Sequence, residues 1–314
     1  MKLSSNATGL IAAAVTVLIW SSFIVVARAS AAHHLLPLDI GFLRIVGAGT
    51  VLLPWGCWLM RKHEPRAART TNSLWGLSPL PLRVTVTAGL FGSVLYAMLA
   101  YSGFFFAPAA HASVLMPGSL PFWTSLLAVV ALRDHLTRAR VMGLACIVLG
   151  DLLVGGASLL KAFDGGEVWK GDLLFMSAAF CWACYTVLVR RHALEPVRAT
   201  IAITALACVS FVPIYGLAAF AGWVPSHLGT APTEEMLFQA IYQGVGSVVI
   251  SGITFNVMIR HFGPVRSTMI TALVPGLSAL GAVIFLNEPM SLNLLGGLAL
   301  VTCGILFGVR LPKP

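Results

Sequence analysis

Few residues in this sequence are of the types that carry out chemistry, and several of these lie within or beside long apolar runs. Asp151 is surrounded by hydrophobic residues, and His111 stands at the start of another apolar run. An ionisable side chain in a membrane is costly and is by default a functional candidate. Asp151 is compatible with two roles, that of a helix-packing acid or that of an acid with a role in gating or coupling. His111 suits a polar contact or a substrate contact equally.

A third ionisable residue, Arg44, lies about one and a half turns inside an apolar run. We interpret it as structural, either paired with Asp39 or extended toward the membrane surface. The sequence has no glycine-rich phosphate loop followed by Lys-Ser/Thr, no paired His/Glu metal motif and no nucleophile elbow. Cys181 and Cys184 form a CxxC in the middle of an apolar run, without a neighbouring His or acid. We therefore expect no cofactor, no metal, no ATP hydrolysis and no enzymatic activity.

The composition determines which kind of element must position these residues. Of the 314 residues, 58% are hydrophobic and only 10% are charged, against about 25% charged in ordinary soluble proteins. The mean hydropathy is +0.90. A soluble domain of this length could not bury that much apolar surface. These values exclude a soluble globule, a nucleic-acid-binding protein and a disordered chain, and they predict an all-α polytopic membrane protein.

Ten apolar stretches are long enough to cross a bilayer, which takes about 20 residues. Two of the connections are very short, Ala107-Pro108 and Gly263-Pro264, and predict tight antiparallel hairpins. The longest polar stretch runs from Arg61 to Ser78, so no soluble domain is expected. The predicted spans are 8–29, 39–60, 84–106, 109–131, 140–158, 171–190, 199–223, 237–260, 264–286 and 292–310.

The basic residues fall between these spans in an alternating pattern. Of the 20 lysines and arginines, sixteen fall on one side of the membrane and four on the other. The four are Arg28, Lys161, Lys170 and Arg44. Because cytoplasmic loops carry the excess of Lys and Arg, this pattern predicts that both termini are cytoplasmic. We expect a multi-pass protein of the bacterial inner membrane.

The two halves of the chain resemble each other. Residues in the first span recur at an offset of 162, as in the pairs Trp20/Trp182 and Arg28/Arg190. Later residues recur at an offset of 154, as in Asp134/Glu288. The pattern predicts a five-helix unit used twice, in residues 1–160 and 161–314. Because five is odd, the second unit must be inverted, which is typical of secondary transporters with a solute site near the midplane.

Two segments resemble the EamA repeat of the drug/metabolite transporter superfamily. They are "APAAHASVLMPGSLPFWTSLLAVVALRDHLTRARVMGLACIVLG" and "GPVRSTMITALVPGLSALGAVIFLNEPMSLNLLGGLALVTCGILFG". The tryptophans of spans one and six and Arg44 also match the family pattern. Within the superfamily the chain is most similar to the YddG type of amino acid exporter. The resemblance implies ten helices, an inverted repeat and a central cavity. Spans one, three, four, six, eight and nine usually surround that cavity.

The presumed cavity offers aromatic and weakly polar side chains. An apolar pocket with a few polar groups suits a small metabolite. Each of these residues is also compatible with plain packing or with lipid contact. Trp20, Trp182 and Tyr96 are the best candidates because of their depth and the repeat symmetry. The full set of substrate-binding candidates is Trp20, Ser21, Tyr96, Tyr101, His111, Trp182, Tyr185 and Asn256.

Five residues are candidates for gating or hinge motion. Pro117 and Pro275 interrupt spans four and nine, and each is compatible with a packing kink or a hinge. Asp134 and Glu288 end the same two spans on opposite faces of the membrane. Each could cap the following helix through its positive dipole end, or lock a gate. Asp151 completes this group.

These features predict a secondary transporter that exports aromatic or other neutral amino acids, or related metabolites, by alternating access. Small multidrug exporters of the same superfamily use an acid in the first helix, and span one here has none. Spans eight to ten have no deep basic group for a phosphate. The alternatives are a channel or scaffold without alternation, an exporter of other metabolites or drugs, and, least favoured, a membrane-embedded enzyme. We expect the lipid bilayer and a small solute as partners, no nucleic acid, and a functional monomer.

Overall fold

A computed structural model describes residues 5–30, 33–63, 74–162 and 166–309 of the chain. All regular structure in these ranges is helical, with turns and short connections between the helices. Nine helical stretches are long and apolar enough to cross a membrane, and a tenth, shorter apolar stretch covers Leu292–Phe307. The predicted all-α fold of ten spans is confirmed. Residues 64–73 and both chain ends lie outside the described ranges, and so do several of the basic residues that predict the orientation.

The first five spans occupy the first half of the chain. Spans one, two and five are single helices, whereas spans three and four are each made of consecutive segments. In chain order the segments are α1 (Ser5–Ser30), α2 (Pro37–His63), α4 (Leu82–Gly89), η1 (Leu90–Val94), α5 (Leu95–Phe106), α6 (Ala109–Leu115), α7 (Leu120–Leu132) and α8 (Arg138–Ala162).

The last five spans are organised in a related way. Spans six and ten are single helices, and spans seven, eight and nine are segmented. In chain order the segments are α9 (Val168–Arg191), α10 (Pro196–Val209), α11 (Phe211–Phe220), α12 (Thr233–Gln239), η2 (Ala240–Ile250), α13 (Ser251–Phe262), α14 (Pro264–Ile270), η3 (Thr271–Leu273), α15 (Val274–Leu286) and α16 (Leu292–Val309).

Irregular helix occurs at corresponding places in the two halves. The third span of each half contains a π-helical segment, η1 or η2. The fourth span of each half is interrupted where the sequence has proline. Pro117 lies in the turn between α6 and α7, and Pro275 lies at the start of α15, directly after the 3-10 turn η3. π-Segments and broken helices are frequent at functional sites because they redirect side chains and free backbone groups.

The connections after the fourth spans also match. Arg133 and Asn287 both adopt the left-handed conformation that ends a helix, with φ of 57° and 53°. Thr137 Oγ1 and Ser291 Oγ then accept hydrogen bonds from backbone N–H groups in the first turn of α8 and α16, respectively. These corresponding turns and caps agree with two copies of one unit.

The fifth helices of the two halves, α8 and α16, cross at glycines. A Cβ atom on Gly150 would lie 2.7 Å from the carbonyl oxygen of Gly297, and one on Gly304 would overlap that of Gly143. Gly143 and Gly150 correspond to Gly297 and Gly304 in the repeat. The two backbones therefore touch across a local pseudo-two-fold axis, a close approach that small residues allow in membranes.

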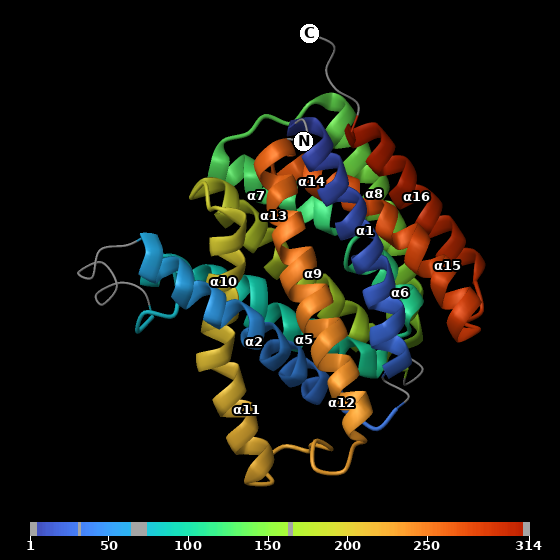
Figure 1. The fold of residues 1–314 in the computed structure, drawn as a ribbon. Helices are drawn as coiled ribbons and strands as arrows, with labels where there is room; N and C mark the ends of the chain where they lie inside the picture. Colours follow the sequence, from blue (N-terminus) through green and yellow to red (C-terminus); the bar gives the residue numbers. More distant parts are fainter. Residues whose placement is uncertain (1–4, 31–32, 64–73, 163–165, 310–314) are drawn as a thin grey trace.

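The first helix of each half packs against the other half. Helix α1 contacts α13 and α15, and α9 contacts α5 and α7. The two halves thus enclose one common centre. Figure 1 shows that α1 begins and α16 ends at the same end of the bundle, which we call the near end. The opposite end, where α1 and α15 end, is called the far end.

Candidate functional site

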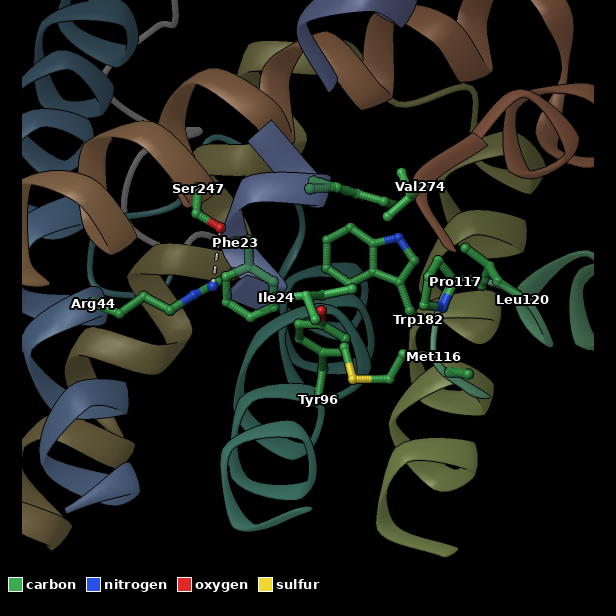
Figure 2. A pocket seen from close by; sticks show the side chains of 12 residues that line it. Phe23, Ile24, Arg44, Tyr96, Met116, Pro117, Leu120, Trp182, Ser247 and Val274 are labelled. Carbon is green, nitrogen blue, oxygen red and sulfur yellow. Dashed lines mark hydrogen bonds between the residues drawn. The ribbon is translucent and has the colours of Figure 1, made fainter. Parts of the chain in front are cut away.

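A small cavity lies between the two halves, and Figure 2 shows the side chains around it. Its volume is about 40 Å³, which is room for about three water molecules. Arg44 and Ser247 lie on one side and Trp182 with Pro117 on the other. The lining residues are Trp20, Phe23, Ile24, Arg44, Tyr96, Met116, Pro117, Leu120, Ala179, Trp182, Ser247 and Val274.

An aromatic cluster forms one wall of this cavity. The ring centroids of Trp20 and Trp182 are 5.6 Å apart in an edge-to-face arrangement, and those of Tyr96 and Trp182 are 4.8 Å apart. Phe255 backs both tryptophans at 4.8 Å and 5.7 Å. Such packing holds large rings in fixed orientations. The structure thus brings together the three residues that depth and symmetry select, Trp20, Tyr96 and Trp182.

The two indole N–H groups of this wall differ. Trp20 Nε1 donates to Ser251 Oγ at 3.2 Å. Trp182 Nε1 is buried and has no hydrogen-bond acceptor among the described residues. Because an unmade buried hydrogen bond is costly, the Trp182 N–H is available to a solute that offers an oxygen.

Arg44 brings a positive charge to the other wall. One guanidinium nitrogen donates to Tyr101 Oη and to Ser247 Oγ, each at 3.2 Å. The pairing with Asp39 considered from the sequence is not made. Asp39 instead accepts hydrogen bonds from Tyr215 Oη at 2.8 Å and Ser226 Oγ at 2.6 Å. Arg44 is 7% exposed, so it does not extend to the membrane surface either.

Other sequence candidates lie away from the cavity wall. Tyr185 and Asn256 are buried and bond to each other, with Asn256 Nδ2 donating to Tyr185 Oη at 2.8 Å. Ser21 donates to the carbonyl of Val17 in its own helix. Tyr101 stands behind Arg44 and supports it. None of these four candidates is among the residues that line the central cavity.

At the far end, Glu288 joins two helices of the opposite half. Its Oε1 lies 3.3 Å from Arg28 Nε at the end of α1, and its Oε2 accepts a hydrogen bond from Ala110 N in the first turn of α6. The capping role considered for Asp134 and Glu288 is filled instead by Thr137 and Ser291. Asp134 is exposed at the near end and forms no ion pair with a described residue.

His111 and Asp151 belong to a second region. His111 Nδ1 lies 2.9 Å from Asp172 Oδ1, which links α6 to α9. Asp151 lines a separate cavity of about 290 Å³ beside Trp123 and Asp172. Its Oδ1 is buried without a hydrogen-bond partner in the described part of the chain. This cavity shares no lining residue with the central one.

The chemistry of the central cavity is that of binding. Among the described residues, no group of three or more His, Cys, Asp or Glu side chains is placed to hold a metal ion. Cys181 and Cys184 are free thiols in α9. Sequence reasoning missed the cavity role of Arg44, Ser247 and Met116. The depth of Arg44 in an apolar run was the signal that pointed to the first of these.

Comparisons with known proteins agree with this architecture. A model of the EamA-like transporter family matches residues 7–156 and 169–310. A "Probable amino-acid metabolite efflux pump" of Salmonella typhimurium is 24% identical, with 96% of this chain and 95% of that protein covered. The "Uncharacterized transporter YyaM" of Bacillus subtilis is 23% identical, with 73% and 74% covered.

Two further similarities are to an archaeal protein and to a solved fold. An "Uncharacterized transporter" of Archaeoglobus fulgidus is 24% identical over 91% of this chain and 92% of that protein. A crystal structure superposes with a TM-score of 0.64 at 21% identity and covers 98% of both chains. That structural likeness supports the fold.

Proposed function

The chain belongs to the EamA-like transporter family, and we propose that it is a secondary transporter that exports aromatic or other neutral amino acids, or related small metabolites, from the cytoplasm by alternating access. The observation that carries this proposal is the central cavity, whose aromatic wall is built by corresponding residues of the two halves, Trp20 and Trp182. A site shared by two inverted units is what two mirror-related open states require.

The size of the cavity supports a cycle of conformations. At about 40 Å³ the cavity holds a few water molecules, and an amino acid is several times larger. A solute therefore enters only after the helices around the cavity have moved apart. The breaks at Pro117 and Pro275 lie in helices that line the cavity, which suits a hinge at these two positions.

The ends of the bundle differ in a way that favours alternation. The Arg28–Glu288 ion pair is made at the far end. The repeat places Arg190 and Asp134 as its counterparts at the near end, and the two form no ion pair with any described residue. The distribution of Lys and Arg supports an orientation with the near end in the cytoplasm. In that orientation the far end faces outward, and export releases the solute there.

Two observations support the substrate class. The Salmonella relative is named as an amino-acid metabolite efflux pump, and the aromatic wall suits an apolar or aromatic side chain. A relation of this chain to the YddG type of amino acid exporter fits both of these observations. Helix α1 has no acid, so transport down the solute gradient is favoured over proton exchange of the multidrug type.

We place the protein in the inner membrane of a bacterium, as a monomer with the lipid bilayer as its surroundings. Residues 1–160 and 161–314 are the two repeat units in this proposal. The proposed function involves no enzymatic reaction and needs no cofactor. A channel or scaffold without alternation is the competing function, and it predicts flux that does not saturate and shows no counterflow.

Proteoliposomes loaded with a mixed amino acid pool test the proposal. We expect saturable efflux of a subset of the pool, and counterflow when the same solute is supplied outside. Trp20→Ala and Tyr96→Ala should lower efflux in cells while leaving the amount of protein in the membrane unchanged. The matched control is Trp58→Ala, because Trp58 is 53% exposed on α2. Non-saturable flux, or normal efflux in both cavity variants, would reject the proposal.

A further inference from the structure

Arg44 is the one lysine or arginine among the described residues whose side chain is buried. A charged side chain inside a membrane protein is costly unless it is compensated. No carboxylate of the described residues lies within 4.0 Å of its guanidinium. The charge therefore lacks the counter-ion that a purely structural arginine at this depth requires.

The acid nearest to Arg44 in α2 is already fully engaged. Asp39 accepts hydrogen bonds from two hydroxyl groups and from the backbone N–H groups of Leu36 and His227. It is completely buried in that network. Arg44 receives neutral partners in its place, namely the hydroxyl groups of Tyr101 and Ser247 and the ring faces of Phe23 and Tyr101.

The guanidinium keeps donors for a further partner. Arginine has five N–H groups in a planar fork, and only one of its terminal nitrogens has acceptors among the described residues. The side chain lines the central cavity, opposite the aromatic wall (Figure 2). A carboxylate matches this fork with two parallel hydrogen bonds.

A second unused donor lies in the same network. Tyr101 Oη donates to Gln243 Oε1 at 3.2 Å. Gln243 is fully buried, and its Nε2 has no acceptor in the described part of the chain. Gln243 and Ser247 both belong to the π-helical segment η2. The network therefore has an excess of donors over acceptors, as expected for a site that receives a negatively charged oxygen.

We propose that Arg44 binds the carboxylate of the transported solute, while the apolar body of the solute packs against Trp20, Trp182 and Tyr96. This inference rests on the proposed transport function and specifies its substrate class. None of the residues that line the cavity in the described part of the chain is acidic. The cavity thus has no counter-charge for an ammonium group. The carboxylate of the solute is required and its amine is dispensable, so monocarboxylates with an aromatic or apolar body are also substrates.

Competition in proteoliposomes that contain the unmodified full chain tests this without any substitution. Counterflow of labelled L-phenylalanine is measured with 3-phenylpropionate, which lacks the amine, and with phenethylamine, which lacks the carboxylate. We expect 3-phenylpropionate to inhibit at concentrations close to those of phenylalanine itself. We expect phenethylamine to have no effect at the same concentrations.

Variants of Arg44 supply the second readout. Arg44→Gln should raise the KM for phenylalanine about 10- to 100-fold, the usual worth of hydrogen bonds to a charged group. Arg44→Lys keeps the positive charge and loses the planar fork. Its KM should therefore lie between the KM of the unmodified protein and that of Arg44→Gln. Arg83→Gln is the matched control, because Arg83 is exposed and remote from the cavity lining. Inhibition by 3-phenylpropionate should weaken in parallel with the KM.

The outcomes separate this inference from the function on which it rests. Saturable phenylalanine counterflow that phenethylamine inhibits, and 3-phenylpropionate does not, would overturn the carboxylate site and leave the exporter standing. The carboxylate site is likewise overturned if Arg44→Gln transports phenylalanine with an unchanged KM. If the unmodified chain shows no saturable counterflow of any amino acid, the proposed function itself fails, and the inference fails with it.

Discussion

Arg28 Nε lies 3.3 Å from Glu288 Oε1, across 260 residues of sequence and between the two halves of the protein. Glu288 also accepts a hydrogen bond from Ala110 N, so one carboxylate connects the end of α1 and the beginning of α6 at the far end. In the proposed cycle this contact must break when the far end opens.

Removing the charge of Glu288 should therefore favour opening at the far end. The side chain of Arg28 is 38% exposed, and such partly exposed ion pairs contribute about 0.2–1 kcal/mol. We therefore expect the population with an open far end to rise by about twofold to fivefold at most. A cysteine introduced at Ala110 reports on opening. In the Glu288→Gln background it should react about twofold to fivefold faster with a membrane-impermeant thiol reagent.

Glu167→Gln is the matched control for this experiment, because Glu167 forms a surface ion pair with Lys170 three residues away. It should leave the labelling rate unchanged. The charge-reversed double variant Arg28→Glu/Glu288→Arg should restore slow labelling. Equal rates in all backgrounds would mean that the ion pair does not hold the far end closed.

The repeat predicts an equivalent contact at the near end. Arg190 and Asp134 correspond to Arg28 and Glu288, and both are exposed in this structure. We expect them to approach each other when the near end closes. Cysteines at positions 134 and 190 should form a disulfide under mild oxidation. This disulfide should stop transport, and reduction should restore it. The pair 134/191 is the control, since Arg191 is rotated by about 100° on α9.

Efficient cross-linking of the control pair, or active protein in which 134/190 never cross-links, would contradict this prediction. The chain without introduced cysteines must be run in parallel, because its six native cysteines are free among the described residues.

The number of spans and the aromatic part of the site could be predicted from sequence for clear physical reasons. Span length follows from bilayer thickness, so apolar runs alone predict the ten spans. Trp20 and Trp182 could be selected because depth and repeat position are both readable along the chain. The helix caps at Thr137 and Ser291 carry a local signal as well, since a hydroxyl residue precedes an apolar run, but from the sequence we considered Asp134 and Glu288 for this role instead.

The polar contacts could not be predicted, because each joins residues far apart in sequence. Asp39 is bonded to Tyr215 across 176 residues, so its proximity to Arg44 in α2 was misleading. Glu288 finds its partners on α1 and α6, and not on the helix that follows it. Tyr185 and Asn256 satisfy each other across 71 residues, which removes two candidates from the cavity wall. Only the packing of the whole bundle determines these pairs.

Asn256 should act on stability and not on substrate affinity. Its side chain bonds to Tyr185 Oη at 2.8 Å and to Thr200 Oγ1 at 3.2 Å, and all three residues are buried. Asn256→Leu leaves the Tyr185 hydroxyl without its partner, whereas Thr200 Oγ1 still donates to the carbonyl of Pro196. The substitution should cost about 1–3 kcal/mol. Thermal unfolding in detergent measures this loss, and the KM of the remaining active protein should not change.

Adding Tyr185→Phe to Asn256→Leu should recover part of the lost stability, because the unpaired Tyr185 hydroxyl is then removed. A raised KM at unchanged stability would instead return Asn256 to the substrate site.

The glycine crossing of α8 and α16 gives a prediction about folding. A side chain at Gly150 would meet the backbone of Gly297, which cannot yield without separating the helices. Gly150→Leu should strongly reduce the amount of folded protein recovered in detergent. Gly156→Ala on the same helix is the control, since a Cβ there meets nothing within 4 Å. Similar yields for both variants would show that α8 and α16 do not pack this closely.

Asp151 allows a test in which stability and function move in opposite directions. Its side chain is 6% exposed, and Oδ1 has no partner among the described residues. A buried polar atom without a hydrogen bond costs about 1–3 kcal/mol. Because Asp151→Leu removes that cost, the variant should unfold at a higher temperature than the unmodified protein.

A destabilising carboxyl group is expected at a position that serves a moving part. Asp151 lines the cavity between α8 and α9, and we expect it to gate the motion of α9 against α8. Asp151→Leu should therefore lower the maximal rate of efflux while leaving the KM unchanged. Leu152→Ala is the control, because Leu152 is 58% exposed beside it. A variant that is more stable and equally fast would show that Asp151 has no part in transport, and a less stable one would show that its carboxyl is satisfied in the folded protein.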